Sequence, residues 1–375
     1  MLPARGTPRI LTVVPICDGH DSPIMTINLE FARHGIEVIY LGYHRSVRDI
    51  VRAAIQENVH AIGISSYNGG HNEFFSEVLH GLRKQGAGQI GLFGGGGGTI
   101  TPADARLLKR RGVDEIFFAG APLDKIVQFV LRHYGGSRRR LPRPARKAGP
   151  NDLELSQLLT AADVHPVPLP LPLATRHPSR TIGITGPGGA GKTTLIDELA
   201  LRFLNSCPGG RLAILSHDPS LATRGALLAD RATMVYAHDD RVFMRSLGTR
   251  GGIAGLAKTS RACVKVLKRA GFDLILVESA GIGQDDVPFA RGLVDKQVLV
   301  MSPHYGSRLQ LQKIAMLEEA DVVVVNKTDL PGARTALSEI EQRLGLNRKQ
   351  SKIIATTAKR HRDPGVDELF REVIS

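Results

Sequence analysis

The chain has 375 residues, 42% of them hydrophobic, and a formal net charge of +13 from 49 Lys and Arg against 36 Asp and Glu. This length predicts two domains. No charged start precedes an unbroken apolar stretch, and no run approaches the roughly 18 apolar residues of a membrane span, so we expect neither a signal peptide nor a membrane partner. Three scattered cysteines (Cys17, Cys207 and Cys263) form no C-x-x-C pair, which is typical of free thiols in a reducing cytoplasm.

Strand-like apolar runs alternate with helical patterns over residues 9–135. The predicted strands are Ile10–Ile16, Val38–Leu41, Ala61–Ser65, Ile90–Phe93 and Glu115–Phe118. The predicted helices include Val47–Glu57, Asn72–Lys84 and Pro102–Arg111. This alternation predicts a doubly wound α/β domain with a parallel sheet, in which ligands bind beyond the carboxyl ends of the strands.

Three of these strand ends carry unusual residues: Asp18-Gly-His20-Asp21, Ser65-Ser66-Tyr67 and Gly94–Gly98. Five successive glycines remove every side chain from one wall, which suits a flat, bulky ligand. Asp18 and His20 point the same way in an extended backbone, so the carboxylate can hold one imidazole nitrogen and leave the other for a metal. Taken alone, His20 is better explained as a surface or capping residue.

Together the three segments resemble the signatures of cobalamin-binding domains in adenosylcobalamin-dependent mutases, most closely the fused isobutyryl-CoA mutases. Like them, this chain lacks a glycine found in many members and has Pro23 there. The resemblance implies a flavodoxin-like domain with adenosylcobalamin as cofactor and His20 as the lower ligand of cobalt. The implied cofactor-binding residues are Asp18, His20, Ser65, Ser66, Gly94, Gly95, Gly96 and Gly97. For His71, a capping or tail-pocket role is favoured over metal ligation.

Residues 136–180 are rich in Pro, Arg and Leu and mark a domain boundary, with one short amphipathic stretch near Leu153–Leu159. Part of the excess charge lies in the basic stretch at residues 138–147. A nucleic-acid interface would need aromatic or groove-reading neighbours, and none is present. A solvated linker or a surface for an acidic partner is therefore favoured, and no nucleic-acid partner is expected.

A second α/β domain is predicted over residues 181–375. Its predicted strands are Thr181–Thr185, Leu212–Ser216, Leu274–Glu278, Gln297–Ser302, Asp321–Asn326 and Lys352–Ala355. After the first of them comes Gly186-Pro-Gly-Gly-Ala-Gly-Lys192-Thr193, a complete G-x-x-x-x-G-K-T phosphate loop. Small glycines let backbone N–H groups surround phosphates, Lys192 supplies a positive charge, and the Thr193 hydroxyl can bind Mg²⁺.

Asn326-Lys327-Thr328-Asp329 completes the signature of a GTPase. In the N-K-x-D pattern, the Asp carboxylate accepts both N–H donors of the guanine edge. Adenine cannot satisfy that carboxylate, and an unpaired buried charge is costly, so the pattern selects GTP over ATP. The two motifs in this order, each at the end of an apolar strand, predict a P-loop GTPase.

This second domain resembles the G-protein chaperones of methylmalonyl-CoA mutase, and most closely the G domain of the fused isobutyryl-CoA mutases. The resemblance rests on both motifs and on His217–Ser220, Gly225–Asp230, Arg241–Leu247 and Val277–Gln284. It implies catalytic roles for Lys192, Asp218 and Glu278, with Mg²⁺ held by Thr193, Asp218, Asp230 and Glu278. The implied nucleotide-binding residues are Gly186, Gly188, Gly189, Ala190, Gly191, Lys192, Thr193, Thr194, Gly281, Asn326, Lys327 and Asp329.

Several assignments in this domain stay open. Arg245 and Arg250 are equally explained as phosphate or switch contacts and as surface ion pairs. Gln284 lies three residues past Gly281, so a role in orienting water is the weaker hypothesis for it. The Thr223–Asp230 segment departs from the family pattern by having Thr223-Arg224 for Thr-Gly and fewer glycines, which makes GTP binding a firmer prediction than its rate of hydrolysis.

A mutase also needs a substrate-binding barrel of about 250 residues, and the chain has no room for one. We therefore expect a cobalamin-binding GTPase subunit that uses GTP to gate or protect adenosylcobalamin in a separately encoded acyl-CoA mutase barrel. The first alternative is the cobalamin half of a split or truncated mutase, and the second is a cobalamin module with a nearly inactive G domain. A homodimer through the G domain is compatible with the resemblance.

Overall fold

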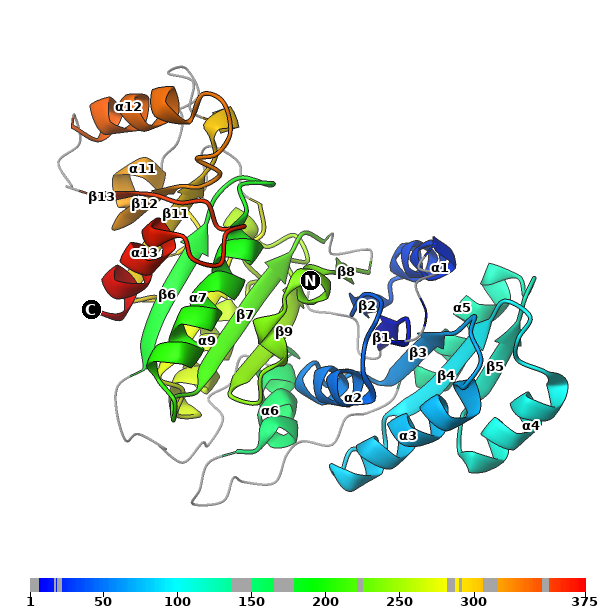
Figure 1. Cartoon of the computed structure of the whole chain (residues 1–375). Helices are drawn as coiled ribbons and strands as arrows, with labels where there is room; N and C mark the ends of the chain where they lie inside the picture. Colours follow the sequence, from blue (N-terminus) through cyan, green and yellow to red (C-terminus); the bar gives the residue numbers. More distant parts are fainter. Residues whose placement is uncertain are drawn as a thin grey trace. The chain divides into compact units, whose positions relative to one another are not determined.

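The computed structural model describes residues 7–16, 18, 22–136, 150–164, 179–220, 225–281, 287–289, 292–305, 316–345 and 351–375. The chain forms two compact units (Figure 1). Unit 1 comprises Met1–Ala145, Pro150–Leu169 and Ser220–Thr233. Unit 2 comprises Arg146–Gly149, Pro170–Pro219 and Met234–Ser375.

Unit 1 contains a six-stranded sheet in the order β5-β4-β3-β1-β2-β8, and every pairing in it is parallel. Its strands are β1 (Arg9–Val13), β2 (Glu37–Tyr40), β3 (Ala61–Ser65), β4 (Gly91–Gly96), β5 (Glu115–Phe118) and β8 (Leu227–Leu228). The order of β1 to β5 is that of flavodoxin-like folds. This confirms the predicted fold class of the first domain.

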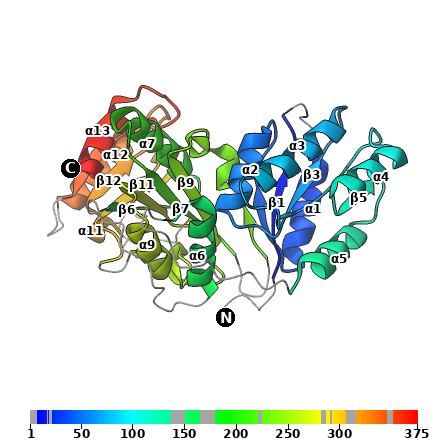
Figure 2. The ribbon, with the colours of Figure 1, turned by 90° about the horizontal axis from the view of Figure 1, so that it is seen from below.

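Helices cover both faces of this sheet, because alternate residues of each strand point to opposite sides. Leu11 and Val13 of β1 pack into a core with α2, α3 and α4, whereas Ile10 packs into a second core with α1 and α5 (Figure 2). The helices are α1 (Ser22–Arg33), α2 (Val47–Gln56), α3 (His71–Lys84), α4 (Pro102–Arg111) and α5 (Leu123–Tyr134).

The amphipathic stretch predicted in the boundary region is a helix, α6 (Asp152–Val164). It belongs to unit 1, where it packs beside α2. Gln56 Nε2 donates to Asp152 Oδ2 at 2.8 Å, and Asn58 Nδ2 donates to Thr160 Oγ1 at 2.8 Å. The helix is therefore tied to the carboxyl end of α2.

Unit 2 contains a seven-stranded parallel sheet in the order β13-β12-β11-β6-β10-β7-β9. Its strands are β6 (Arg180–Thr185), β7 (Leu212–Asp218), β9 (Val242–Gly248), β10 (Leu274–Glu278), β11 (Lys296–Met301), β12 (Val322–Val325) and β13 (Lys352–Ala355). All six predicted strands are present. By contrast, β9 was not predicted as a strand, although its residues carry one of the family motifs.

The helices of unit 2 also cover both faces of its sheet. Val322 and Val324 of β12 pack into the core beneath α7 and α13, while Val323 and Val325 pack into the core beneath α11 and α12. The helical segments are α7 (Lys192–Ser206), α9 (Ser260–Arg269), α11 (Met316–Glu319), α12 (Ala333–Leu344), α13 (Pro364–Ile374), η1 (Tyr236–His238), η2 (Ile253–Gly255) and η3 (Pro303–Tyr305).

One segment lies outside the unit in which the sequence predicts it. Residues 181–375 were expected to form one domain, but β8 and α8 (Asp230–Thr233) pack with unit 1. Val38 and Ile39 of β2 pair with Leu227 and Leu228. The apolar side chains of Ala226 and Leu228 are buried in the core of unit 1. This burial explains why the segment packs with unit 1, although its neighbours along the chain belong to unit 2.

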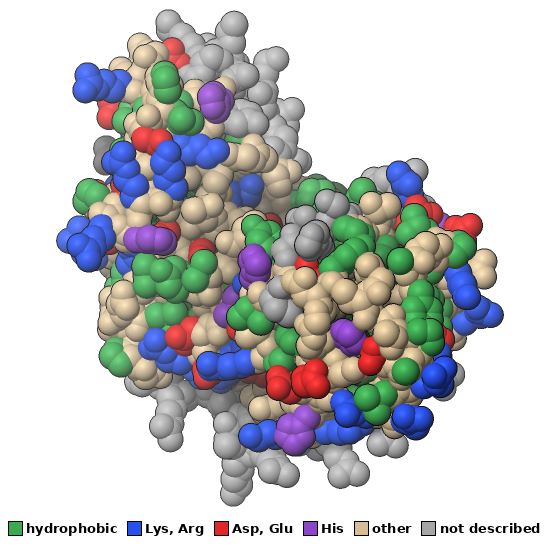
Figure 3. Space-filling view, turned by 45° about the vertical axis from the view of Figure 1, so that its right-hand side comes forward, with side chains coloured by type: hydrophobic (Ala, Val, Ile, Leu, Met, Phe, Trp, Pro, Cys, Tyr) green, Lys and Arg blue, Asp and Glu red, His purple; other side chains and the backbone are tan. Residues whose placement is uncertain are grey.

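Charge is mixed on the surface shown in Figure 3, where Lys and Arg side chains are interspersed with Asp and Glu among the coloured residues. The basic stretch at residues 138–147 lies outside the described residues. Across the part of the chain that is described, no helix combines the length and the apolarity needed to cross a bilayer.

We expect Phe75→Ala to lower the free energy of unfolding of unit 1 by about 3–5 kcal/mol, because Phe75 is fully buried and its removal leaves a cavity. Urea unfolding followed by far-ultraviolet circular dichroism measures the change. Leu131→Ala is the control, since Leu131 is 36% exposed and should cost about 1 kcal/mol or less. Equal shifts for both variants would contradict the assigned core.

Candidate functional site

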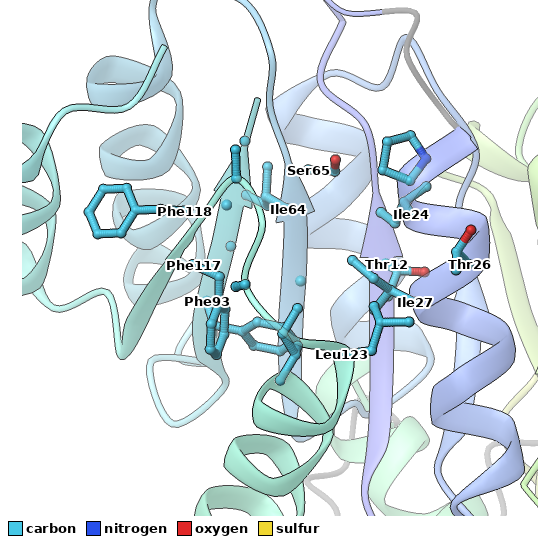
Figure 4. A pocket seen from close by; sticks show the side chains of 18 of the residues that line it. Thr12, Ile24, Thr26, Ile27, Ile64, Ser65, Phe93, Phe117, Phe118 and Leu123 are labelled. Atoms are coloured by element: carbon cyan, nitrogen blue, oxygen red, sulfur yellow. The ribbon is translucent and has the colours of Figure 1, made fainter. Parts of the chain in front are cut away.

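A cavity of about 320 Å³ lies in unit 1, near the carboxyl ends of its strands (Figure 4). Its floor is formed by Thr12 of β1 and by residues 63–65 of β3 and 93–96 of β4, and its side by the segment 117–121 after β5. Side chains of α1 and α5, among them Ile24, Ile27 and Leu123, close the opposite wall. The lining is mostly apolar, with Ser65 and Thr12 supplying hydroxyls, so the cavity suits an apolar ring that carries a few polar atoms.

The glycine run forms one wall of this cavity. The glycines are also needed for the ends of the neighbouring strands to pack together. A Cβ atom on Gly96 would lie 1.7 Å from the Ser66 carbonyl oxygen, and one on Gly95 would lie 2.3 Å from the Phe117 carbonyl oxygen. On Gly97 it would lie 1.9 Å from the Tyr67 ring. The end of β4 can therefore pack between the ends of β3 and β5 only if it lacks side chains.

The loops after β1 and β3 are joined through Asp18. Its carboxylate is buried and accepts a hydrogen bond from the Tyr67 backbone N–H. Two of the three predicted signatures thus meet in the structure, and the third joins them because Ser66 N donates to Gly95 O at 2.9 Å. His20, the predicted cobalt ligand, lies outside the described residues.

His71 begins α3 after Gly70, which has a left-handed backbone at φ 85°. The imidazole is 8% exposed, and its Nε2 lies 3.5 Å from Asp104 Oδ2. Hydrogen bonds from Thr101 and Asn72 hold the pKa of Asp104 well below its usual value, so His71 faces an ionised carboxylate. This position fits a structural role at the helix start.

The phosphate loop of unit 2 runs from the end of β6 to the start of α7. Gly186, Gly189 and Gly191 have φ values of 145°, 75° and 91°, a backbone conformation that side chains disfavour. The Lys192 ammonium is buried inside the loop, where it donates to Gly186 O at 2.9 Å and to Pro187 O at 3.2 Å. The loop therefore holds a positive charge among backbone groups, which is an anion-binding arrangement.

Two predicted magnesium ligands lie next to each other beside the loop. Thr193 Oγ1 donates to Glu278 Oε1 at 2.9 Å, and Glu278 at the end of β10 is 3% exposed. Asp218, the last residue of β7, ends the neighbouring strand. A hydroxyl beside carboxylates is a set of hard oxygen donors that fits Mg²⁺.

The N-K-x-D motif is bonded directly to the phosphate loop. Asn326 Nδ2 donates to Ala190 O at 3.0 Å, and Lys327 Nζ donates to Gly189 O at 2.7 Å. Asn326 Oδ1 in turn accepts from Thr356 Oγ1 and from Ala358 N. Two motifs more than 130 residues apart in the sequence thus form one site, and the segment after β13 supports it.

Asp329 lies at the rim of this site, with its Oδ2 2.5 Å from Lys359 Nζ. The hydrogen bond from Lys359 lowers the pKa of Asp329. The carboxylate therefore stays an ionised acceptor at any ordinary pH. Gly281 lies at the other side, where a Cβ atom would come within 3.0 Å of the Gly188 backbone.

The remaining residues predicted for the nucleotide site lie in unit 1, within the sheet of unit 2 or outside the described residues. Asp230 begins α8 in unit 1, and its role in binding magnesium stays a prediction. Thr223, Arg224 and Gln284 lie outside the described residues. Arg245 is 1% exposed within β9, so it is not a surface residue.

His217 has no role in the sequence-based prediction, but in the structure it lies against the backbone of Glu278. It is 2% exposed, with Nδ1 2.7 Å from Glu278 O and Nε2 2.7 Å from Ser260 Oγ. The imidazole therefore ties β7 to the end of β10 and to the start of α9. Its signals in the sequence are its place at the end of an apolar strand and its position in the His217–Ser220 motif.

Comparison with known proteins agrees with this geometry. A family model described as "Methylmalonyl Co-A mutase-associated GTPase MeaB" matches residues 172–375. A second, described as "B12 binding domain", matches residues 8–125. The two matches correspond to the two candidate sites.

Several proteins named "Fused isobutyryl-CoA mutase" are similar to nearly the whole chain. One from Geobacillus kaustophilus is 36% identical over 390 residues, which is 96% of this chain and 36% of that protein. One from Cupriavidus metallidurans is 36% identical over 399 residues, which is 100% of this chain and 36% of that protein. The chain thus spans little more than a third of the length of these relatives.

We expect Gly96→Ala to lower the affinity for cobalamin at least about tenfold, because the new methyl group would displace the Ser66 backbone and deform the cavity. Titration followed by visible absorbance measures the dissociation constant. Gly69→Ala is the control, since a Cβ atom there meets nothing within 4 Å. Equal affinities for the two variants would contradict the role assigned to the glycine wall.

Proposed function

We propose that this chain, which belongs to the family of methylmalonyl-CoA mutase-associated GTPases (MeaB), hydrolyses GTP to GDP in order to gate or protect adenosylcobalamin in an acyl-CoA mutase. The chain joins a B12-binding domain to a MeaB GTPase domain. The observation that carries the proposal is the direct bonding of Asn326 and Lys327 to the phosphate loop. A guanine-specific motif and a phosphate cradle are thereby built as one site.

The residues of unit 2 supply the groups that phosphoryl transfer needs, since catalysis there depends mainly on positioning and charge neutralisation. Lys192 would move its ammonium from the loop carbonyls to the phosphate oxygens. Thr193, Glu278 and Asp218 would hold Mg²⁺, directly or through water. Asp329 would accept the two N–H donors of guanine, and Lys359 keeps it ionised for that role.

Unit 1 would hold the corrinoid at the carboxyl ends of its strands. The cavity between the sheet and α1 and α5 has room for one arm of a large cofactor, with Ser65 and the glycine wall facing it. His20 would be the lower ligand of cobalt, and the buried Asp18 would position the loop that carries it. Adenosylcobalamin supplies radical chemistry in enzymes that use it.

The partner in this proposal is a substrate-binding barrel of an acyl-CoA mutase. Its support is the similarity to fused mutases of which this chain covers 36%. The same observation favours a second candidate function, the cobalamin-binding part of a split or truncated mutase. Free thiols at Cys207 and Cys263 support a cytoplasmic location.

We expect Asp329→Asn to weaken GTP binding at least about 100-fold and to favour xanthosine triphosphate instead. The amide N–H of Asn can donate to the carbonyl that xanthine carries where guanine has its amino group. Competition binding with fluorescent nucleotides measures both affinities. Lys359→Met is the matched control, because it keeps the carboxylate and should not change the preferred base. Unchanged base preference in Asp329→Asn would remove the assigned role.

We expect the wild-type protein to retain adenosylcobalamin with its own base displaced from cobalt, and His20→Ala to lose that spectrum. An imidazole that replaces the cofactor's base changes the visible absorption, so the two proteins are compared after gel filtration. His34→Ala serves as the control, since that histidine is exposed and its imidazole contacts Glu30 of α1. Identical spectra for His20→Ala and the wild type would exclude His20 as the ligand.

A further inference from the structure

The neighbouring strands β7 and β10 of unit 2 each extend beyond the point where their backbones pair with each other. Within these described strands, the pairing of β7 with β10 ends at Leu215 and Val277. Past that point β7 stays paired with β9 as far as Asp218, and β10 stays paired with β6 as far as Glu278. Both strands therefore end in a predicted magnesium ligand, beyond the last residue pair that joins them.

The side chain of His217 joins the two strands just past the end of this pairing. Its Nδ1 lies 2.7 Å from the backbone oxygen of Glu278. A carbonyl oxygen can only accept a hydrogen bond, so Nδ1 carries a proton and donates it. The imidazole is buried, and His217 directly precedes Asp218 in the chain. One residue thus connects the backbones that carry both predicted ligands.

Hydroxyl groups hold the carboxylate of Glu278 itself. Thr193 Oγ1 donates to Oε1 at 2.9 Å, and Ser216 Oγ donates to Oε2 at 3.3 Å. The backbone from which this carboxylate extends is fixed on one side by the pairing of β10 with β6. On the other side it is fixed by the bond from His217. Because Ser216 directly precedes His217, its hydroxyl depends on the same anchor.

The second ring nitrogen of His217 faces a different element. Nε2 lies 2.7 Å from Ser260 Oγ, at the start of α9. The Ser260 hydroxyl also donates to Ala257 O at 2.6 Å. Nδ1 therefore faces the end of β10, and Nε2 faces α9. Variants that keep one of these contacts and lose the other can separate their effects.

The position of the Glu278 backbone matters because Mg²⁺ tolerates little distortion. This ion requires near-octahedral geometry, with ligand distances of about 2.0–2.1 Å. Groups that orient metal ligands through hydrogen bonds typically contribute about 10- to 100-fold to metal affinity. Where backbone pairing between two ligand-bearing strands has ended, a side-chain hydrogen bond takes over the task of holding them at a set distance.

We propose that His217 is a positioning residue of the magnesium site. Its hydrogen bond to Glu278 O sets the separation of the Asp218 and Glu278 backbones, and thereby the affinity of the nucleotide complex for a divalent cation. The inference rests on the nucleotide and Mg²⁺ site of the proposed function. It adds a residue that acts through the backbone of a ligand.

Two substitutions of His217 separate its two contacts. The amide nitrogen of asparagine is attached to Cγ, as Nδ1 is, so His217→Asn should keep a donor for Glu278 O. The amide nitrogen of glutamine lies one atom further along the side chain, as Nε2 does. His217→Gln should therefore keep the contact with Ser260 and lose the bond to Glu278 O.

The measurement is the binding of Mn²⁺ to the full chain with GDP, followed by the electron paramagnetic resonance of free Mn²⁺, an ion that prefers the same oxygen ligands as Mg²⁺. We expect His217→Gln to weaken Mn²⁺ binding at least about tenfold and His217→Asn to stay within about threefold of the wild type. Ser260→Ala is the matched control, since it removes the partner of Nε2 and should bind Mn²⁺ like the wild type. The affinity for GDP in EDTA should be the same in all four proteins.

GTP hydrolysis supplies a second readout. The concentration of Mg²⁺ that gives half-maximal hydrolysis should rise in His217→Gln by the same factor as the Mn²⁺ dissociation constant, and His217→Asn should restore it. If His217→Gln does not fold, His217→Leu takes its place, because leucine fills the site without a donor. His217→Asn is also a test by itself, since a tenfold loss of Mn²⁺ affinity there would overturn the inference.

The outcomes separate this inference from the proposed function. Equal Mn²⁺ affinities in His217→Gln and the wild type overturn the positioning role, and so does a larger loss in Ser260→Ala than in His217→Gln. A chain that binds GDP and Mn²⁺ without hydrolysing GTP overturns the proposed function, while the Mn²⁺ affinities of the variants still decide the role of His217. A chain that binds no guanine nucleotide overturns both.

Discussion

The fully buried carboxylate of Glu57 holds together three parts of unit 1. It accepts from Arg9 at the start of β1 and from Arg231 in α8, so it joins the sheet, the end of α2 and a distant part of the chain. Burial lowers the pKa of Arg231, and the charge of Glu57 opposes that shift. Removing one partner of such a group costs about 3–5 kcal/mol, because a charge is left buried and unpaired. The packing of β8 and α8 therefore contributes to the stability of the unit.

Both candidate sites follow from one property of parallel sheets, whose loops after the strands gather at a single edge. In unit 1, this edge brings Asp18 to Tyr67 and the glycine run to Ser66. In unit 2, it brings Asn326 to Ala190 and Thr193 to Glu278. Short loops on well-packed strands hold these groups in place before a ligand binds, which lowers the ordering cost of binding.

Most of the strands and the nucleotide-binding motifs could be predicted from local sequence patterns. Most strands were predicted to within a few residues, because apolar runs bounded by turns are local features. The P-loop and N-K-x-D were recognised for the same reason. By contrast, β8 has only two residues, which is too short for a periodic pattern to predict it. The role of His217 was also missed, since its partners, Glu278 and Ser260, are more than 40 residues away along the chain.

The sequence by itself determined the fold class and the two ligand motifs, because each depends on residue types at short spacing. Only the tertiary structure decided that residues 225–233 pack with unit 1. Their neighbours in the chain belong to the G domain, yet Leu227 and Leu228 pair with Val38 and Ile39, and Arg231 pairs with Glu57, which lie about 170 to 190 residues earlier. Burial and charge pairing are settled by contacts distant in sequence, so no local pattern could have shown that these residues complete the other sheet.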